Sequence, residues 1–162
     1  MSSIIINLTN LFETLQARKY CIIKIDEGFP NYKIGSDIDI FCYDLDGCAK
    51  DILAYLQHQI SEEIIIQIEK KDDQLYIDVV RDNNIHLRFD LYGALPSYAN
   101  VSIKPALFSS ILENSIVLKK EDWFVKVPNK MDEAILRYIE YQEWFATRPD
   151  KIKHIRHLEK MI

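Results

Sequence analysis

Two aspartates with one residue between them, Asp37 and Asp39, are the side chains of this sequence best suited to chemistry. They lie in the run Gly35-Ser36-Asp37-Ile38-Asp39-Ile40-Phe41, whose apolar residues alternate as in a buried strand. Because side chains alternate between the two faces of a strand, both carboxylates point the same way and the isoleucines point the other way. Adjacent carboxylates repel each other unless a cation lies between them. Hard oxygen ligands suit Mg²⁺, with Mn²⁺ as an alternative, so the motif predicts a metal site for phosphate chemistry.

A third carboxylate occurs in the run Ile85-His86-Leu87-Arg88-Phe89-Asp90-Leu91. Its apolar residues alternate with polar ones, so Asp90 is expected on the polar face near the end of a strand. If this strand neighbours the one that carries Asp37 and Asp39, three carboxylates meet on one face. Three carboxylates on adjacent strands can hold one or two divalent ions, and we therefore predict Asp90 as the third metal ligand.

Asp78 is the alternative third acid, because the residues beside it make an equally regular strand pattern. The segment 81–84, Arg-Asp-Asn-Asn, is typical of a hairpin connection. A two-residue turn at Asn83-Asn84 would pair Asp78 with Phe89 and place Asp78 and Asp90 on opposite faces. We prefer Asp90 because His86 and Arg88 share its face, whereas Asp78 would share the side of Phe89.

The pattern along the whole chain predicts an α+β protein, with a mixed sheet flanked by helices and a C-terminal helical hairpin. Helices are expected over residues 3–17, 45–60, 105–112 and 131–145, and again after Pro149; strands are expected over 20–25, 37–43, 64–69, 75–80, 85–91, 116–118 and 123–127. We expect a sheet domain over 1–128 and a helical tail over 129–162, packed together as one unit. The first tail helix has one predicted apolar face, formed by Met131, Ala134, Ile135, Tyr138, Ile139, Gln142 and Phe145.

Composition narrows the function classes. The 162 residues are 48% apolar and carry a net charge of −5, which argues against a nucleic-acid partner but leaves a metal-bound nucleotide open. The three cysteines, Cys21, Cys42 and Cys48, are odd in number and lack zinc-type spacing, so we expect buried free thiols and a cytoplasmic protein. The sequence starts without signal-peptide features and has no run of membrane-spanning length, so no membrane partner is expected.

The segment 34–41, Ile-Gly-Ser-Asp-Ile-Asp-Ile-Phe, resembles the acidic strand of the polymerase-beta-like nucleotidyltransferase superfamily. The predicted order of elements is similar too: a helix, a strand, the Asp-x-Asp strand, a helix, and a later strand with a third acid. The tail resembles the helical end of bacterial members found among surface-polysaccharide genes, in Pro128, Asp132, Glu133, Tyr138, Glu140, Asp150, Lys151, Ile152, Lys153 and His154.

This resemblance implies that Asp37 and Asp39 bind metal and that Asp90 assists them and activates the attacking hydroxyl. The implied reaction transfers a nucleoside monophosphate from a nucleoside triphosphate to a hydroxyl acceptor and releases pyrophosphate. Typical members carry a Gly-Ser or Gly-Gly turn after the first strand, where this chain has Lys-Ile-Asp-Glu-Gly at 24–28. The expected phosphate-binding groups are instead Gly35, Ser36, Lys24, Lys33 and Arg88.

The missing turn leaves a second hypothesis open, a catalytically inert module of the same fold that binds a nucleotide, a partner chain or no small ligand. A sugar-nucleotide glycosyltransferase also holds a metal through Asp-x-Asp, but this chain is short for that fold. An acidic domain with an aromatic tail is compatible with a homodimer. We interpret the basic residues of the last helix as a solvated face rather than a phosphate site; they are Lys151, Lys153, His154, Arg156 and His157.

Overall fold

The structure is a computed structural model that describes residues 6–59 and 61–161. Its elements, in chain order, are α1 (Leu8–Thr14), β1 (Tyr20–Ile23), β2 (Ser36–Cys42), α2 (Leu45–Gln57), β3 (Ile64–Lys71), β4 (Gln74–Arg81), β5 (Asn84–Tyr92), α3 (Ala106–Glu113), β6 (Ile116–Lys119), β7 (Phe124–Val127), α4 (Lys130–Trp144), the 3-10 helix η1 (Pro149–Lys151) and α5 (Ile152–Met161). Five strands form one sheet in the order β1-β2-β5-β4-β3, and β6 and β7 form a separate pair. The predicted α+β class is confirmed.

Parallel pairing occurs in this sheet between β2 and β5, whereas its other neighbouring strands pair antiparallel. The two parallel strands are far apart in sequence, because α2 and the β3–β4 hairpin lie between them. The sheet is therefore mixed, as expected. The parallel pair at its centre brings the two predicted acidic strands into direct contact.

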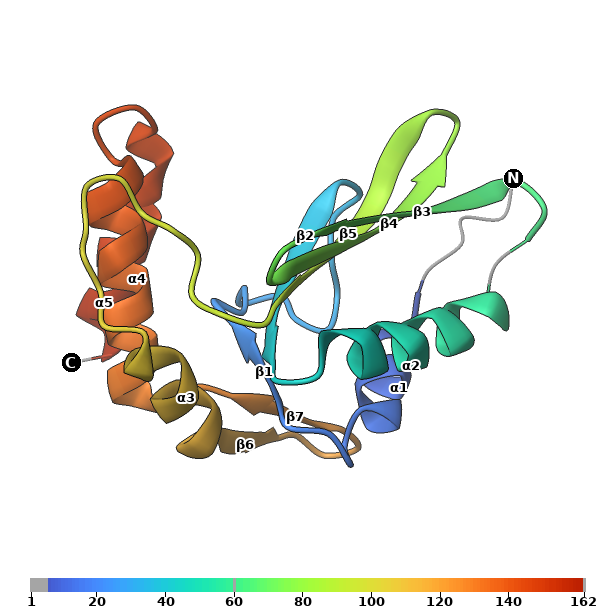
Figure 1. Ribbon diagram of the computed structural model, residues 1–162, viewed down its shortest axis with the longest axis horizontal. Coiled ribbons are helices and arrows are strands. Elements are labelled where there is room, and N and C mark those ends of the chain that lie inside the picture. Colours follow the sequence, from blue (N-terminus) through green and yellow to red (C-terminus); the bar gives the residue numbers. More distant parts are fainter. Residues whose placement is uncertain (1–5, 60, 162) are drawn as a thin grey trace.

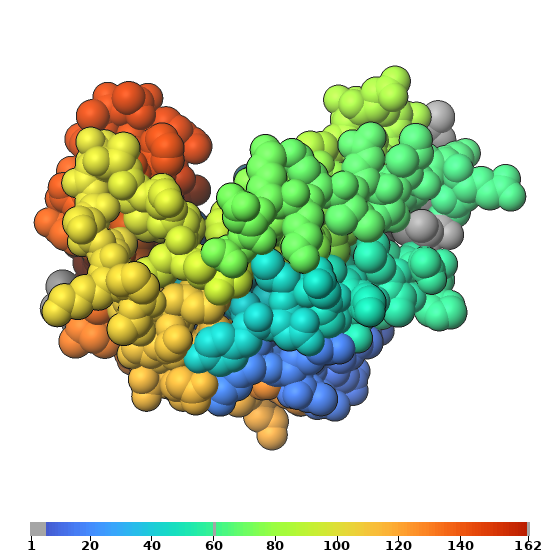
Figure 2. Space-filling model, in the orientation of Figure 1, coloured from blue at the N-terminus to red at the C-terminus, as the bar shows by residue number. Residues whose placement is uncertain are grey.

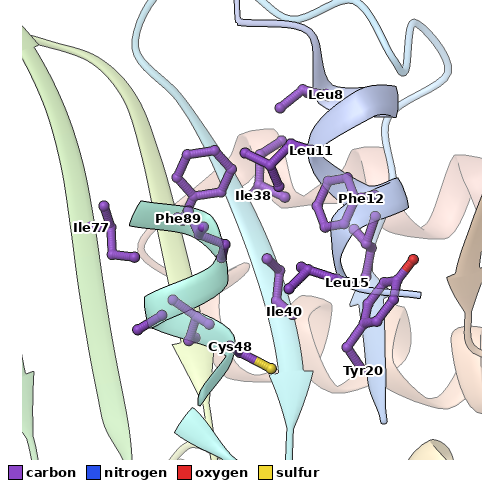
Figure 3. Packing of buried hydrophobic residues seen from close by; sticks show 14 of the residues in the cluster. Leu8, Leu11, Phe12, Leu15, Tyr20, Ile38, Ile40, Cys48, Ile77 and Phe89 are labelled. Atoms are coloured by element: carbon purple, nitrogen blue, oxygen red, sulfur yellow. The ribbon is translucent and has the colours of Figure 1, made fainter. Parts of the chain in front are cut away.

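Helices α1 and α2 cover one face of the sheet (Figure 1). Figure 3 shows Leu11 and Phe12 of α1 packed near Ile38 and Ile40 of β2 and Phe89 of β5. Leu11, Phe12, Ile40 and Phe89 are all completely buried. This layer is the main hydrophobic core, and it fixes which side of β2 and β5 faces away from the helices. All three cysteines are buried free thiols, as expected.

The opposite face of the sheet is apolar over one half. There Cys21 and Ile23 of β1 and Phe41 of β2 pack against Phe108 of α3 and Leu136 of α4. The other half carries polar side chains of β2, β4 and β5, on the side of the sheet opposite α1 and α2. Figure 2 shows the molecule hollowed between these strands and the arm formed by α4 and α5. The fold therefore leaves the polar half of the sheet open beside a helical arm.

Helix α1 is shorter than the predicted 3–17. Asn7 is its N-cap, and the Asn7 side chain accepts a hydrogen bond of 3.1 Å from the backbone N–H of Asn10. The helix therefore begins at Leu8 and ends at Thr14. The predicted helical residues 3–5, 60 and 162 lie outside the described residues. Asp44 caps α2, because its side chain accepts a hydrogen bond from the backbone N–H of Gly47.

The β4–β5 hairpin is confirmed, but its turn lies one residue earlier than predicted. Asp82 and Asn83 occupy the two turn positions with φ of 51° and 60°, and Arg81 pairs with Asn84. Two consecutive positive φ angles are what a tight hairpin turn of the favoured twist requires, and Asp and Asn tolerate them best after glycine.

The predicted register of this hairpin is wrong as a result. The earlier turn alone would place Asp78 opposite Leu87. A β-bulge between Val79 and Val80 moves the pairing back by one residue, so that Asp78 lies opposite Arg88 and Ile77 lies opposite Phe89. Asp78 and Asp90 consequently share one face of the sheet instead of lying on opposite faces. A bulge adds a residue to one strand, and no local sequence pattern indicated it.

Helix α4 buries a different face from the predicted one. Met131 and Tyr138 are 71% and 51% exposed. The buried residues are Asp132, Leu136, Arg137, Ile139, Glu140 and Glu143. Charged side chains can be buried here because they have partners: Glu143, for example, accepts hydrogen bonds from the backbone N–H groups of Ala99 and Asn100, at 2.7 and 2.8 Å. Hydrophobic periodicity cannot identify such a face.

The C-terminal elements form the predicted helical hairpin, with α4 and α5 packed together through η1, whose first residue is Pro149. The expected boundary at residue 128 follows the end of β7, and the division into two domains stays a prediction. None of the helices in the described part of the chain has the length and apolar content needed to cross a bilayer.

Candidate active site

The parallel pairing of β2 and β5 brings the predicted carboxylates to one face of the sheet. Asp39 lies opposite Asp90, and Asp37 lies opposite Arg88. Residues in opposing positions of neighbouring strands share a face and lie close together. Asp37, Asp39 and Asp90 therefore form one group, hereafter the aspartate cluster.

Asp90 is the most buried member of the aspartate cluster. It is 8% exposed, and its Oδ1 atom has no hydrogen-bond partner among the described residues. Burial and the negative charges of Asp39 and Asp37 raise the pKa of Asp90 to about 7. Partial burial and the charge of Asp39 also raise the pKa of Asp37. Carboxylates that disfavour their own ionisation in this way form a site that a cation would stabilise.

Asp78 lies on the same face, but Arg88 neutralises it. The Arg88 guanidinium donates from Nε and Nη2 to the two oxygens of Asp78, at 2.6 and 2.8 Å, and lies over the Tyr76 ring at 4.9 Å. The hydrogen bonds that Arg88 donates to the Asp78 carboxylate raise the pKa of Arg88. Arg88 is thus held as the partner of Asp78, and its predicted role in phosphate binding stays a prediction.

Lys24 directly follows β1 and reaches the aspartate cluster. Its φ of 55° lies in the left-handed region that favours glycine. The Lys24 ammonium lies 3.2 Å from Asp39 Oδ2 and 3.0 Å from Glu140 Oε1, and Lys151 Nζ lies 3.2 Å from Glu140 Oε2. These four groups form a continuous chain of ion pairs from β2 to η1, hereafter the Lys24 network. Although burial lowers the pKa of Lys24, the carboxylates of Asp39 and Glu140 raise it above its ordinary value.

Gly35 and Ser36 stand at the start of β2 beside Asp37. Gly35 has a φ of 88°, and its backbone N–H donates to the carbonyl of His86 at 2.8 Å. The N–H of Ser36 donates to the carbonyl of Lys33 at 3.0 Å, while Ser36 Oγ accepts from the Lys33 N–H at 3.1 Å. Both amides are therefore engaged within the protein. Phosphate binding by Gly35, Ser36 and the exposed Lys33 stays a prediction.

A cleft of about 550 Å³ lies between the start of β2 and the helical arm. Asp37 and Asp39 line one wall of this cleft, together with Lys24 and the loop that follows it. The other wall, hereafter the basic wall, is formed by Arg137, Arg148, Lys151, Lys153, His154, Arg156, His157 and Lys160. The basic residues of the last helix thus face a cleft that they share with two of the predicted metal ligands, rather than forming only a solvated surface.

His154 is the most buried residue of the basic wall, at 3% exposed. Arg137 Nη1 lies 3.4 Å from His154 Nδ1, and because arginine can only donate, Nδ1 is the acceptor and Nε2 carries the proton. His154 Nε2 is buried and has no partner among the described residues. Burial and the charge of Arg137 lower the pKa of His154 to about 4, so the ring is neutral near pH 7.

The aspartate cluster supplies the oxygen donors that Mg²⁺ prefers. Within residues 6–59 and 61–161, no three His, Cys, Asp or Glu side chains lie close enough together to hold one metal ion. The Lys24 ammonium already lies 3.2 Å from one oxygen of Asp39. The Oδ1 of Asp90 is buried without a partner among the described residues, and a metal ion held by Asp37, Asp39 and Asp90 stays a prediction.

No family model and no curated protein matches this sequence. Among solved structures, the chain is similar to JHP933 from Helicobacter pylori, with a TM-score of 0.43 and 12% identity over 80% of this chain and 52% of that one. It is also similar to a presumed nucleotidyltransferase from H. pylori, with a TM-score of 0.41 and 12% identity over 80% of this chain and 54% of that one. The chain thus spans about half the length of both. This likeness concerns the arrangement of elements, and the surface-polysaccharide context stays a prediction.

Proposed function

We propose that the protein is a metal-dependent nucleotidyltransferase that transfers a nucleoside monophosphate from a nucleoside triphosphate to a hydroxyl acceptor. The observation that carries this proposal is a single cleft with Asp37 and Asp39 on one wall and the basic wall opposite. A triphosphate needs surrounding cations, and its reacting phosphorus needs a metal ion beside it. The cleft volume of about 550 Å³ falls within the roughly 300–1,000 Å³ of small-molecule sites.

The aspartate cluster and the basic wall have separate roles in this reaction. Mg²⁺, with Mn²⁺ as an alternative, would neutralise and orient the phosphates when bound by the aspartate cluster. Asp90, which lies opposite Asp39 on the neighbouring strand, would accept the proton of the acceptor hydroxyl through its carboxylate. The acceptor oxygen bonds to the α-phosphorus while the bond to the leaving pyrophosphate breaks. Lys153 and Arg156, which make no ion pair within the described residues, are available for the leaving charge.

The proposed setting is the cytoplasm, which supplies both triphosphates and the reducing conditions that suit three free thiols. The acceptor is a molecule with a free hydroxyl group. A homodimer stays a prediction.

A catalytically inert nucleotide-binding module is the second candidate, and the Lys24 network favours it. Lys24 already neutralises Asp39, and the backbone amides of Gly35 and Ser36 are already hydrogen-bonded. In such a module the triphosphate would still bind against the basic wall, but no nucleotide would be transferred.

Thermal unfolding with Mg²⁺ and each common nucleoside triphosphate tests binding, and pyrophosphate release tests turnover. At a ligand concentration 100 times Kd, binding stabilises by about 2.7 kcal/mol, which for this size raises the unfolding midpoint by roughly 5–10 °C. We expect this shift and pyrophosphate release in the wild type. Asp37→Asn and Asp39→Asn should abolish release.

The matched control is Asp46→Asn, an exposed aspartate of α2 paired with Lys70, which should behave as wild type. A shift without pyrophosphate release, with any hydroxyl acceptor supplied, would establish the inert module. The absence of any shift would exclude both candidates.

A further inference from the structure

The basic wall contains cations that the protein neutralises and cations that it does not. Those that form ion pairs with carboxylates of the protein, over distances of 2.8 to 3.2 Å, are Arg137, Arg148, Lys151 and Lys160. Lys153 and Arg156 line the same cleft and make no ion pair within residues 6–59 and 61–161. The wall therefore keeps two positive charges that a ligand could compensate.

His154 lies in this wall and has a donor without an acceptor. The residue is 3% exposed, and its Nε2 atom has no hydrogen-bond partner in the described part of the chain. A buried N–H group that has left water without finding an acceptor is costly, and most such groups in proteins are paired. Because His154 lines the cleft, a ligand bound there can supply the acceptor.

Arg137 fixes the tautomer and the orientation of the His154 ring. The Arg137 guanidinium donates from Nε to Glu133 at 2.8 Å and from Nη2 to the carbonyl of Ile25 at 2.9 Å. Its Nη1 atom lies 3.4 Å from His154 Nδ1. A guanidinium can only donate, so Nδ1 accepts and Nε2 carries the proton. His154 Nε2 is thus a hydrogen-bond donor, which suits an oxygen acceptor and not a metal ion.

The carboxylates beside His154 already have cationic partners. Glu133 pairs with Arg137, and Glu140 pairs with both Lys24 and Lys151. These carboxylates leave His154 Nε2 without an acceptor. A ligand oxygen that accepts from Nε2 lies among cations, so a negatively charged oxygen is favoured over a neutral one. Phosphate groups carry such oxygens and accept from several donors at once.

We infer that the basic wall contains a phosphate subsite, in which His154 Nε2 donates to the terminal phosphate of a polyphosphate ligand and Lys153 and Arg156 compensate its charge. Asp37 and Asp39 line the opposite wall, so a triphosphate whose α-phosphate lies near them directs its terminal phosphates toward this subsite. The inference rests on the proposed triphosphate ligand. It goes further, because it adds a neutral histidine to the groups that recognise the ligand.

Nuclear magnetic resonance of the His154 Nε2–H group tests the contact in the wild-type protein. Inorganic pyrophosphate is added in metal-free buffer, with sodium chloride of equal ionic strength as the comparison. The Nε2 nitrogen and proton signals of His154 should shift with pyrophosphate and stay in place with chloride. An equal shift with chloride, or none at saturating pyrophosphate, would overturn the inference.

Substitutions of His154 test what the donor contributes to affinity, measured by isothermal titration calorimetry. His154→Leu removes the donor and should weaken binding of pyrophosphate and of a nucleoside triphosphate by about tenfold or more. His154→Gln keeps an N–H donor and should retain most of the affinity. The matched control is His58→Leu, which replaces an exposed histidine at the C-terminal end of α2 and should bind as the wild type does.

Unchanged pyrophosphate affinity in a folded His154→Leu protein, or no pyrophosphate binding by the wild type, would overturn the subsite. Either result leaves the nucleotidyltransferase proposal intact, because Mg²⁺-dependent pyrophosphate release tests that proposal separately. A loss confined to pyrophosphate, with triphosphate affinity unchanged, would overturn the assignment of the subsite to the triphosphate. If circular dichroism shows that His154→Leu does not fold, the wild-type resonance experiment decides.

Discussion

Single aspartates on this sheet differ in role because they differ in partners. Asp90 has an unpartnered oxygen beside Asp39, whereas both oxygens of Asp78 are bound by Arg88. Asp90→Asn should lower Mg²⁺-dependent pyrophosphate release by about 100-fold or more, because it removes a ligand and the proton acceptor. Asp78→Asn should instead cost about 1–3 kcal/mol of stability, because Arg88 loses a charged acceptor. Turnover rates and urea unfolding measured on both variants separate the two roles.

The pair of variants is its own control, since both replace an aspartate by asparagine on the same face of the sheet. Equal losses of turnover in the two variants would show that the reaction depends on both aspartates of this face rather than on Asp90 in particular. A larger loss of turnover for Asp78→Asn would identify Asp78 as the third acid.

The residues of the aspartate cluster could be predicted from sequence, but their partners could not. Alternation of apolar and polar residues placed Asp37, Asp39 and Asp90 on polar faces, and parallel pairing then joined them. The contact between Lys24 and Glu140 spans 116 positions along the chain, and no local pattern reports a contact of that kind. The left-handed backbone conformation of Lys24 could not be predicted either, because a lysine in the sequence does not indicate this conformation.

At the scale of elements, α5 carries the basic-wall residues whose positive charge is not neutralised by an ion pair within the described residues. Lys153 and Arg156 line the cleft and make no ion pair among the described residues. The double variant Lys153→Gln and Arg156→Gln should weaken triphosphate binding by about tenfold or more, since each charged hydrogen bond contributes at least about 1 kcal/mol. Mn²⁺ binding in the absence of nucleotide should not change, because the aspartate cluster is untouched. Isothermal titration calorimetry measures both affinities.

The control for this variant is Lys50→Gln, which removes an exposed charge from α2 on the other face of the sheet. The wild-type affinity should also fall with added salt, and less steeply in the double variant. Unchanged triphosphate affinity in the double variant would mean that α5 contributes only a solvated surface, as the sequence alone indicated.

The positions of helices and strands were easier to predict from this sequence than the faces that they bury. Apolar runs with turn residues between them located β3, β4, β5, β6 and β7 to within about two residues. The face of α4 was wrong because burial there follows hydrogen-bonded charges such as Glu140 and Glu143 rather than hydrophobicity. The predicted β4–β5 register was wrong because a bulge adds one residue to one strand of the pair. Such a residue can be recognised only when the pairing of both strands is known.

At the scale of the whole molecule, the open face separates an acidic sheet from a basic helical arm, and each side buries one group in its neutral form. Asp90 has an ordinary pKa of 3.8 and a folded pKa of about 7, so between these values the folded state binds more protons than the unfolded state. Its contribution to stability therefore falls as pH rises through this range. His154 has an ordinary pKa of 6.5 and a folded pKa of about 4, so the unfolded state binds more protons and stability rises with pH there.

The contributions of Asp90 and His154 have opposite signs in nearly the same pH range, so they largely cancel. Without metal, these two groups should therefore change the wild-type unfolding midpoint little between about pH 4.5 and 7. Each pKa difference corresponds to at most about 3–4 kcal/mol. Asp90→Asn leaves the His154 contribution alone, and its midpoint should rise with pH by roughly 5–10 °C relative to the wild type. His154→Gln should show the opposite slope, and the double variant should again be flat. Calorimetry in a chelating buffer measures all four curves, and parallel curves would show that neither group is held neutral by the fold.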